Sequence, residues 1–276
     1  TDAESYALYG QGTYRPAGPD GAFGLTVGLR HTWDEKSINQ TLAILNNDSF
    51  SDSAVTGHIT ADYRFNRDVN GYAKYSRGYR SGGFNIRSVQ DPFESEFIDS
   101  YEAGLKTELA NGLVRLNGAV FFSEYTDEQI TQPIATTGGG FQTQIVNAGA
   151  TEYTGIELEM LAKPSDALTL NASFGYTDRE VKEFPFQDAT TNGLINIANE
   201  ITPGSAPDTT LNLGASYVWG LQNGDVTARV SSTYESGRSF FANPRTSPLA
   251  NDLVAGSRNL IDAQLRWDDI SIGGKD

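Results

Sequence analysis

Arginine and aromatic side chains recur in the stretches of this chain that lack a regular hydrophobic pattern. A guanidinium group presents N–H donors in a fixed fork, which suits paired oxygens such as those of a carboxylate. A phenylalanine ring nearby adds a flat apolar surface for the rest of a small ligand. The candidate binding residues are Arg80, Phe84, Asn85, Arg87, Phe93, Phe141, Arg238, Phe240, Phe241 and Arg245.

Residues suited to catalysis are sparse. The chain has no cysteine and two histidines, His31 and His58, which form no paired metal or haem arrangement. We find no Ser, His and Asp constellation. Nor is there a carboxylate pair that the sequence could place roughly 5 to 10 Å apart, as glycoside hydrolysis requires. We therefore expect no enzyme activity, no metal site and no cofactor.

The composition excludes two further classes of protein. With 35 acidic and 20 basic residues the formal net charge is −15, whereas binding to nucleic acid phosphates requires a basic surface. No apolar run is long enough for a membrane-spanning helix. We therefore expect no nucleic acid partner and no helical membrane protein.

The candidate residues lie in long connections that alternate with short turns. Gly, Pro, Asn and Asp dominate the turns. The predicted turns are Pro16 to Gly21, Asn66 to Asp68, Ala110 to Gly112, Pro164 to Ala167, Gly220 to Asp225 and Ser271 to Lys275. The predicted long connections are roughly 33–53, 82–97, 127–150, 184–207 and 238–256. Because antiparallel strands send alternate connections to opposite ends, all the turns should share one end of a sheet and all the long loops the other.

Between these connections, apolar and polar residues alternate. From residue 23 the odd positions are Phe23, Leu25, Val27 and Leu29, and the even ones are small or polar. Residues 55–65, 114–123, 156–160 and 168–177 show the same split. A wall with lipid on one side and water on the other needs this period of two. The fold class predicted is therefore all-β, an antiparallel transmembrane β-barrel wall.

A large soluble β-sandwich or barrel is the alternative, since its strands also alternate. The predicted strands run about ten to thirteen residues, whereas strands of globular proteins average about five or six. This length and the asymmetry of the connections favour the membrane barrel, whose extracellular loops are the long ones.

The pattern contains about eleven strands, while single-chain bacterial barrels close with an even number. The first residues fall inside a strand pattern, and Gly273 to Asp276 form a turn with no strand after it. We expect a partial wall whose open edges prevent stable folding alone.

Three blocks resemble the TonB-dependent outer-membrane receptors. They are Gly71 to Asn85 (GYAKYSRGYRSGGFN), Tyr101 to Glu108 with Leu113 to Tyr125 (YEAGLKTE, LVRLNGAVFFSEY), and Val146 to Glu159 (VNAGATEYTGIELE). The first is similar to the family strand that ends in Gly-Phe-Asn, and the second to its Tyr-Glu-x-Gly-Leu-Lys strand and hairpin partner.

The resemblance implies a barrel of about 22 strands with a plugged lumen. Residues 1–276 would then be a single incomplete barrel domain, without the plug, the first strands or the final strand. The family imports scarce nutrients through the outer membrane of Gram-negative bacteria. It is energised by the TonB complex, which binds an N-terminal segment that residues 1–276 would not include. Expected partners are a small metal chelate, with a ferric siderophore as the default cargo, and outer-membrane lipid and lipopolysaccharide.

Other functions stay open at this point. A passive porin or adhesin-like barrel would lack a plug upstream, and cobalamin or saccharides remain alternative cargoes within the family. The charged residues of the polar face are expected to pair across the wall or contact the plug rather than bind ligand. These are Arg30, Arg64, Lys74, Glu102, Lys106, Glu157 and Glu159.

Overall fold

The computed structural model describes most of the chain as β-structure. The described residues are 2–40, 46–85, 92–135, 141–147, 149–187, 194–202, 206–240, 243, 245 and 253–270. The long strands are β1 (Asp2–Tyr14), β2 (Phe23–Gln40), β3 (Asn46–Arg64), β4 (Val69–Arg80), β5 (Glu96–Leu109), β6 (Val114–Thr126), β9 (Ala150–Ala162), β10 (Leu168–Val181), β13 (Thr209–Leu221), β14 (Gly224–Glu235) and β17 (Arg258–Asp268). The short elements are β7 (Gln129–Ala135), β8 (Phe141–Asn147), β11 (Pro185–Gln187), β12 (Leu194–Asn196), the 3-10 helix η1 (Ala198–Glu200), β15 (Arg238–Ser239) and β16 (Val254–Ala255).

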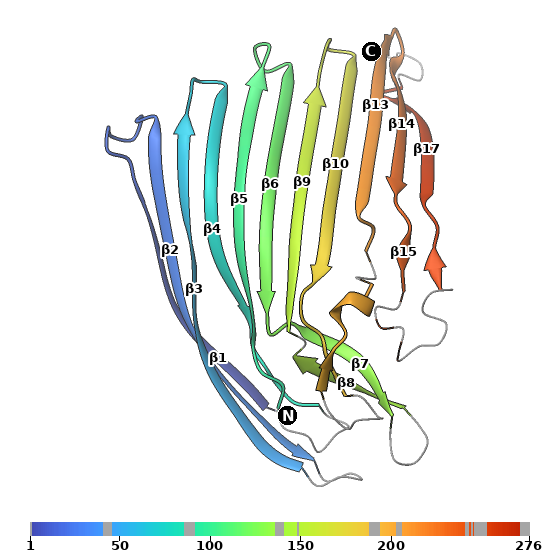
Figure 1. The fold of residues 1–276 in the computed structure, drawn as a ribbon. Helices are drawn as coiled ribbons and strands as arrows, with labels where there is room; N and C mark the ends of the chain where they lie inside the picture. The colour runs from blue at the N-terminus through green and yellow to red at the C-terminus, as the bar shows by residue number, and fades with distance from the viewer. Residues whose placement is uncertain are drawn as a thin grey trace.

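The long strands form one 11-stranded sheet in chain order, and each is antiparallel to its neighbours. Figure 1 shows the short turns between long strands at one end of this curved sheet and the longer connections at the other. We call these the turn end and the loop end. Short hairpins inserted at the loop end account for the gaps in the strand order. Among the described residues, no helix is long and apolar enough to cross a membrane.

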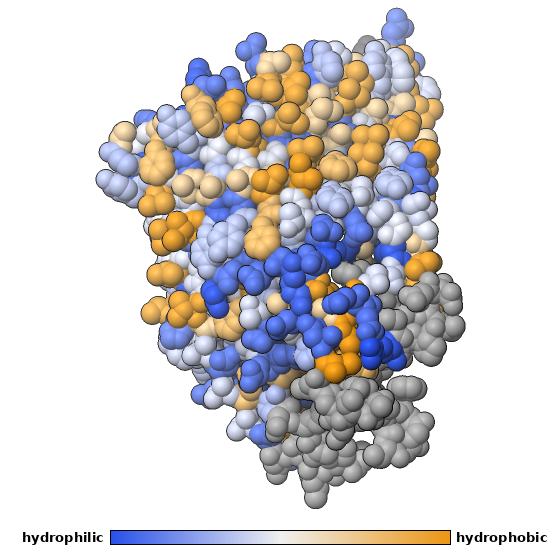
Figure 2. Space-filling view, viewed as in Figure 1, coloured by the Kyte–Doolittle hydropathy of each residue, from blue (hydrophilic) through white to orange (hydrophobic). Residues whose placement is uncertain are grey.

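The predicted alternation is confirmed by the strand register. Ala61, Ala73 and Ala103 lie side by side on β3, β4 and β5, and the row continues through Val120 and Ile156. The adjacent row on the opposite face contains Thr60, Lys74 and Glu102. We call the two surfaces the apolar face and the polar face. Figure 2 shows the apolar face, with hydrophobic residues gathered over the half that carries the turns.

Four of the predicted long connections contain strands instead. Those over 184–207 and 238–256 hold the short β11–β12 and β15–β16 pairs. The connection predicted over 33–53 is wrong, because β2 and β3 pair continuously from Phe23↔Tyr63 to Gln40↔Asn46. The connection over 127–150 holds the β7–β8 hairpin. Backbone pairing needs no apolar face, so the polar residues beyond the apolar band still form a ladder. The β2–β3 hairpin therefore continues past its pairing with β4 as an arm at the loop end (Figure 1).

Large side chains on the polar face lie over glycines of the next strand. A Cβ on Gly104 would stand 2.7 Å from the Tyr72 ring, and one on Gly155 would stand 2.3 Å from the Phe121 ring. Real Cβ atoms do not approach other heavy atoms this closely, so only glycine fits at these positions. Each aromatic ring thereby fixes the register of its strand against the neighbour.

The fit at Gly155 gives a stability prediction. Gly155→Ala in the full-length protein should lower the free energy of unfolding by about 1–3 kcal/mol, because both Phe121 and the Tyr176 carbonyl oxygen crowd the new methyl group. Gly175→Ala on β10 is the control, since its new methyl would meet only the Thr210 hydroxyl at 3.0 Å. Urea unfolding of both variants measures the difference. Equal losses of unfolding free energy would contradict the close packing of Phe121 against Gly155.

Several charges of the polar face pair within the wall, as expected. Glu102 accepts a hydrogen bond of 2.5 Å from the Tyr72 hydroxyl, and the Lys106 ammonium lies 5.4 Å from the Tyr72 ring centroid. Arg64 donates to the Pro19 carbonyl. The ion pair between Arg15 and Asp62, at 2.9 Å, joins the first turn to β3.

Candidate functional site: the loop end

The β4–β5 connection at the loop end is fastened to the β7–β8 hairpin by asparagine side chains. Asn85 donates to the Ile145 carbonyl and accepts from the Ile145 amide, both at 2.8 Å. Asn147 accepts from the Glu94 amide at 2.7 Å and donates to the Glu94 and Asp127 carbonyls. Each amide group therefore acts as a peptide unit would in a sheet, and joins the β4–β5 connection to the β7–β8 hairpin.

Gln129 adds a third connection between the same segments. Its side-chain amide donates to the carbonyls of Arg80, Ser81 and Glu94. Its backbone N–H donates to the Glu96 carboxylate at 2.7 Å, and Arg80 pairs with that carboxylate at 2.6 Å. Glu96 is thus a buried hub between β4, β5 and β7.

The β2–β3 arm covers the other side of the β4–β5 connection. Lys36 donates to the Gly82 carbonyl at 2.5 Å, and the Tyr79 hydroxyl donates to Asp34. Ser95 donates to Asp52, which lies directly opposite Asp34 in the β2–β3 register. The arm, the connection and the hairpin therefore form one hydrogen-bonded layer, which we call the loop layer.

The connection between β10 and β13 has a small core of its own. Phe184, Ile197, Ala198 and Ile201 are buried together, and Ile130 of β7 packs against them. Above this core Arg245 makes a bidentate pair with Glu200, at 2.5 and 2.6 Å, and lies 5.9 Å from the Phe186 ring centroid. The ion pair with Arg245 lowers the pKa of the Glu200 carboxyl. This core links the loop layer to the C-terminal half of the chain.

The structure places the predicted binding residues in different settings. Asn85 is 8% exposed and fully engaged in holding the loops, and Phe93 packs against Gly83, to which its backbone also pairs. Arg80 is paired but half exposed, while Arg238 pairs with Glu235 at 3.2 Å. Phe240 is 54% exposed. Phe84 is half-buried. Arg87 and Phe241 lie outside the described residues, as does the Phe141 side chain.

Sequence reasoning did not single out several residues that organise this end of the sheet. Tyr79, Gln129, Asn147 and Glu128 hold or line the loop layer, and Arg179 pairs with Asp208 at 2.6 Å beneath it. Asn147 lies within the third block of family resemblance, VNAGATEYTGIELE. Tyr79 lies within the first block, GYAKYSRGYRSGGFN. The other three carry no signal in one sequence; the partners of Gln129 and Arg179, for example, lie 27 to 49 residues away.

Glu128, between β6 and β7, gives the loop layer a pH dependence. Burial raises the pKa of its carboxyl, the neighbouring Glu96 carboxylate raises it further, and Arg80 opposes them. Because the pKa is above its ordinary value of 4.5 in the folded state, the folded loop layer binds a proton more tightly than the unfolded chain does. Stability should therefore rise as the pH falls from neutral toward 4.5.

Glu128→Gln should remove this dependence. We expect amide-exchange protection factors across β7 and β8 to rise on acidification in the full-length protein and to stay constant in this variant. Glu124→Gln, an exposed carboxylate near the end of β6, is the matched control and should keep the rise. A variant at Glu128 that retains the wild-type pH profile would refute the assignment.

Comparison with known proteins agrees with the sheet and its asymmetric connections. A family model described as "TonB dependent receptor-like, beta-barrel" matches residues 1–275. The ferric yersiniabactin uptake receptor FyuA from Yersinia pestis is 21% identical with a TM-score of 0.75, over 97% of this chain and 38% of that one. The siderophore receptor PiuA from Acinetobacter baumannii is 16% identical with a TM-score of 0.71, over 96% and 37%. The copper transporter OprC is 14% identical with a TM-score of 0.70, over 95% and 39%.

At these identities the solved structures show the shared fold, and this chain spans less than two fifths of their length. The family model covers nearly every residue of the chain. Its members are transporters and not enzymes, which agrees with the absence of a catalytic constellation from the sequence. The chain therefore belongs to the family of TonB-dependent receptor β-barrels.

Proposed function

We propose that residues 1–276 are part of the barrel wall of an outer-membrane receptor that takes up a ferric siderophore, with energy supplied by the TonB complex. The observation that carries the proposal is the family match over residues 1–275, on a wall with one apolar and one polar face. The names of FyuA and PiuA support the cargo class. The plug, the TonB-binding segment and the remaining strands would lie elsewhere in a Gram-negative outer-membrane protein.

The ligand would be captured at the loop end, which faces the exterior in this orientation. Guanidinium groups there would meet the anionic oxygens of the chelate, and exposed rings would cover its apolar parts. Arg80, Arg238, Arg245 and Phe240 are described candidates with partly or largely exposed side chains. Asn85 would act indirectly, by holding the loops in position.

Uptake by cells tests this function. Bacteria that lack their own siderophore receptors and express the full-length protein should accumulate radiolabelled iron from a ferric siderophore panel, and removal of TonB should abolish the accumulation. Phe240→Ala should raise the half-saturating concentration without lowering the amount of folded receptor. Uptake that persists without TonB would indicate a passive barrel. TonB-dependent uptake of copper, cobalamin or a saccharide, without uptake of a ferric siderophore, would overturn the proposal that the cargo is a ferric siderophore.

A further inference from the structure

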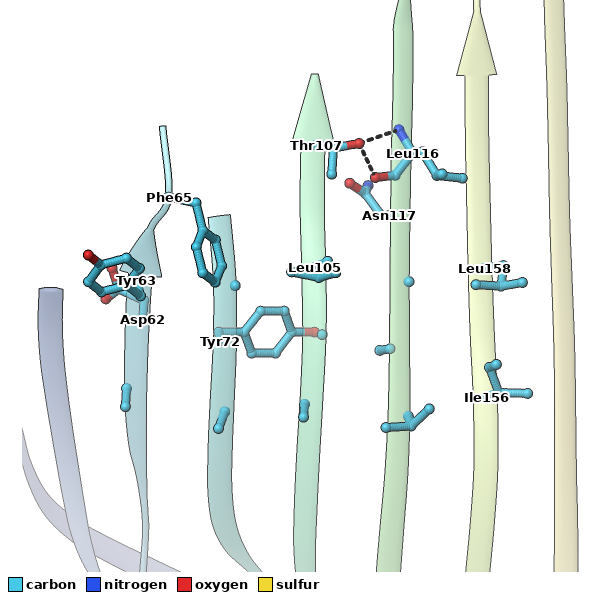
Figure 3. Close-up of a pocket in the computed structure, with 18 of the residues that line it drawn as sticks. Asp62, Tyr63, Phe65, Tyr72, Leu105, Thr107, Leu116, Asn117, Ile156 and Leu158 are labelled. Carbon is cyan, nitrogen blue, oxygen red and sulfur yellow. Dashed lines mark hydrogen bonds between the residues drawn. The ribbon is translucent and has the colours of Figure 1, made fainter. Parts of the chain in front are cut away.

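A groove of about 700 Å³ crosses the apolar face near the turn end (Figure 3). Its floor consists of Ala61, Ala73 and Ala103, which lie side by side on β3, β4 and β5. On most of the apolar face the exposed positions carry leucine, valine or aromatic side chains. Three adjacent alanines therefore leave a hollow in an otherwise filled surface.

Aromatic and aliphatic side chains wall the groove. Tyr63 and Phe65 meet edge to face, with ring centroids 5.1 Å apart, and the Phe65 ring covers Gly71. On the opposite side Leu158 leans over Gly118, where an added Cβ would lie 3.0 Å from its methyl group. Figure 3 shows Phe65 and Leu158 on either side of Leu105.

The lining of the groove is mostly apolar. At the edge of the groove, the Thr107 hydroxyl donates a hydrogen bond to the Leu116 carbonyl at 2.6 Å and accepts one from the Leu116 amide at 3.3 Å (Figure 3). Asp62 is paired with Arg15, and Tyr72 donates to Glu102. These three polar side chains are thus satisfied within the wall, and the Tyr63 hydroxyl and the Asn117 amide are the other polar side-chain groups at the border of the groove.

Two aromatic rows bracket the groove. Tyr63 and Phe65 lie on its turn-end side, and Tyr75, Tyr101 and Phe122 form a row on its loop-end side, with centroids 5.2 and 6.4 Å apart. The Arg77–Asp99 ion pair comes directly after this second row. Aromatic rows of this kind mark the edges of the apolar band of an outer-membrane barrel, so the groove lies inside the hydrocarbon layer.

We propose that the groove holds one acyl chain of a phospholipid from the periplasmic leaflet. The inference rests on the proposed membrane location, in which the turn end is periplasmic, so this leaflet supplies the lipid nearest the groove. Lipid tails are as apolar as leucine, and association in the bilayer is therefore driven by close packing rather than by escape from water. An alanine floor between larger walls gives a flexible chain contacts on three sides, which a filled surface does not offer.

Filling the groove tests the proposal. Ala73→Leu with Ala103→Leu places two branched side chains in open space, because both alanines are exposed. Ala215→Leu with Ala263→Leu makes the same change on β13 and β17 of the apolar face, outside the groove. Native mass spectrometry of the full-length receptor in mild detergent, titrated with dipalmitoyl phosphatidylglycerol or phosphatidylethanolamine, counts the bound lipids.

We expect one retained phospholipid in wild type and in the control pair, and at least fivefold less in the filled variant. Equal retention in the two pairs, or none in wild type, would overturn the proposal. Loss of a wild-type dimer on filling would assign the groove to a second copy of the chain and also overturn it. Membrane fractionation and siderophore binding of the same preparations test the proposed function separately, so failure of one is distinguishable from failure of the other.

Discussion

Asn85→Leu is expected to release the β4–β5 connection from the β7–β8 hairpin. Leucine has a similar size but leaves both the amide and the carbonyl of Ile145 without their partner. A fully buried backbone group that loses its partner costs about 1–3 kcal/mol, and here two partly buried groups lose their partners together. Hydrogen exchange of the full-length protein should show at least a tenfold loss of protection at the Ile145 amide, with β9 and β10 unchanged.

Asn212→Leu is the matched control for this prediction. Asn212 lies on the polar face of β13 and makes a side-chain hydrogen bond of 3.1 Å with Ser173. This variant should leave the exchange of β7 and β8 as it is in wild type. If Asn85→Leu behaves like this control, the asparagine does not hold the loops, and its role in positioning the ligand site fails with it.

The wall could be predicted from the sequence because its physical constraint is local. Alternate residues such as Leu25 and Val27 must share a face in any strand, and Gly, Pro, Asn and Asp mark the turns that end it. The β2–β3 arm could not be predicted, because this local alternation is absent from it. Beyond Trp33 the apolar alternation stops, and the ladder is maintained by backbone pairs and by contacts such as Lys36 to Gly82, which leave no periodic signal.

The candidate site is harder to predict, because the same residue type serves two purposes there. Phe240, with its largely exposed ring, suits a ligand contact, whereas the Asn85 side chain is already hydrogen-bonded to the Ile145 backbone. The two cannot be told apart from composition, since the partner of Asn85 lies 60 residues away. Arg80 falls between them, with an exposed guanidinium already paired to a buried carboxylate.

Phe184→Ala should have the largest local effect on stability. Its side chain is 1% exposed and lies at the centre of the core beneath β11, β12 and η1. Removing a buried phenylalanine side chain costs about 3–5 kcal/mol, and a core of four buried residues has few neighbours that could fill the cavity. Limited proteolysis of the full-length protein should cut within residues 182–187 or 194–202 in the variant while the long strands remain protected.

Phe240→Ala removes the same atoms from an exposed position and is the control for this change. Phe240→Ala should leave the proteolysis pattern as in wild type and weaken siderophore uptake. Phe184→Ala should make the segment around Phe184 accessible to protease, and should weaken uptake only because this segment is disturbed. Because Ile130 of β7 packs on the Phe184 core, the damage should also reach the β7–β8 hairpin and lower its exchange protection. Protection of the hairpin that survives Phe184→Ala would show that the two halves of the loop end are stabilised independently. Ligand capture would then have to be explained for each half separately.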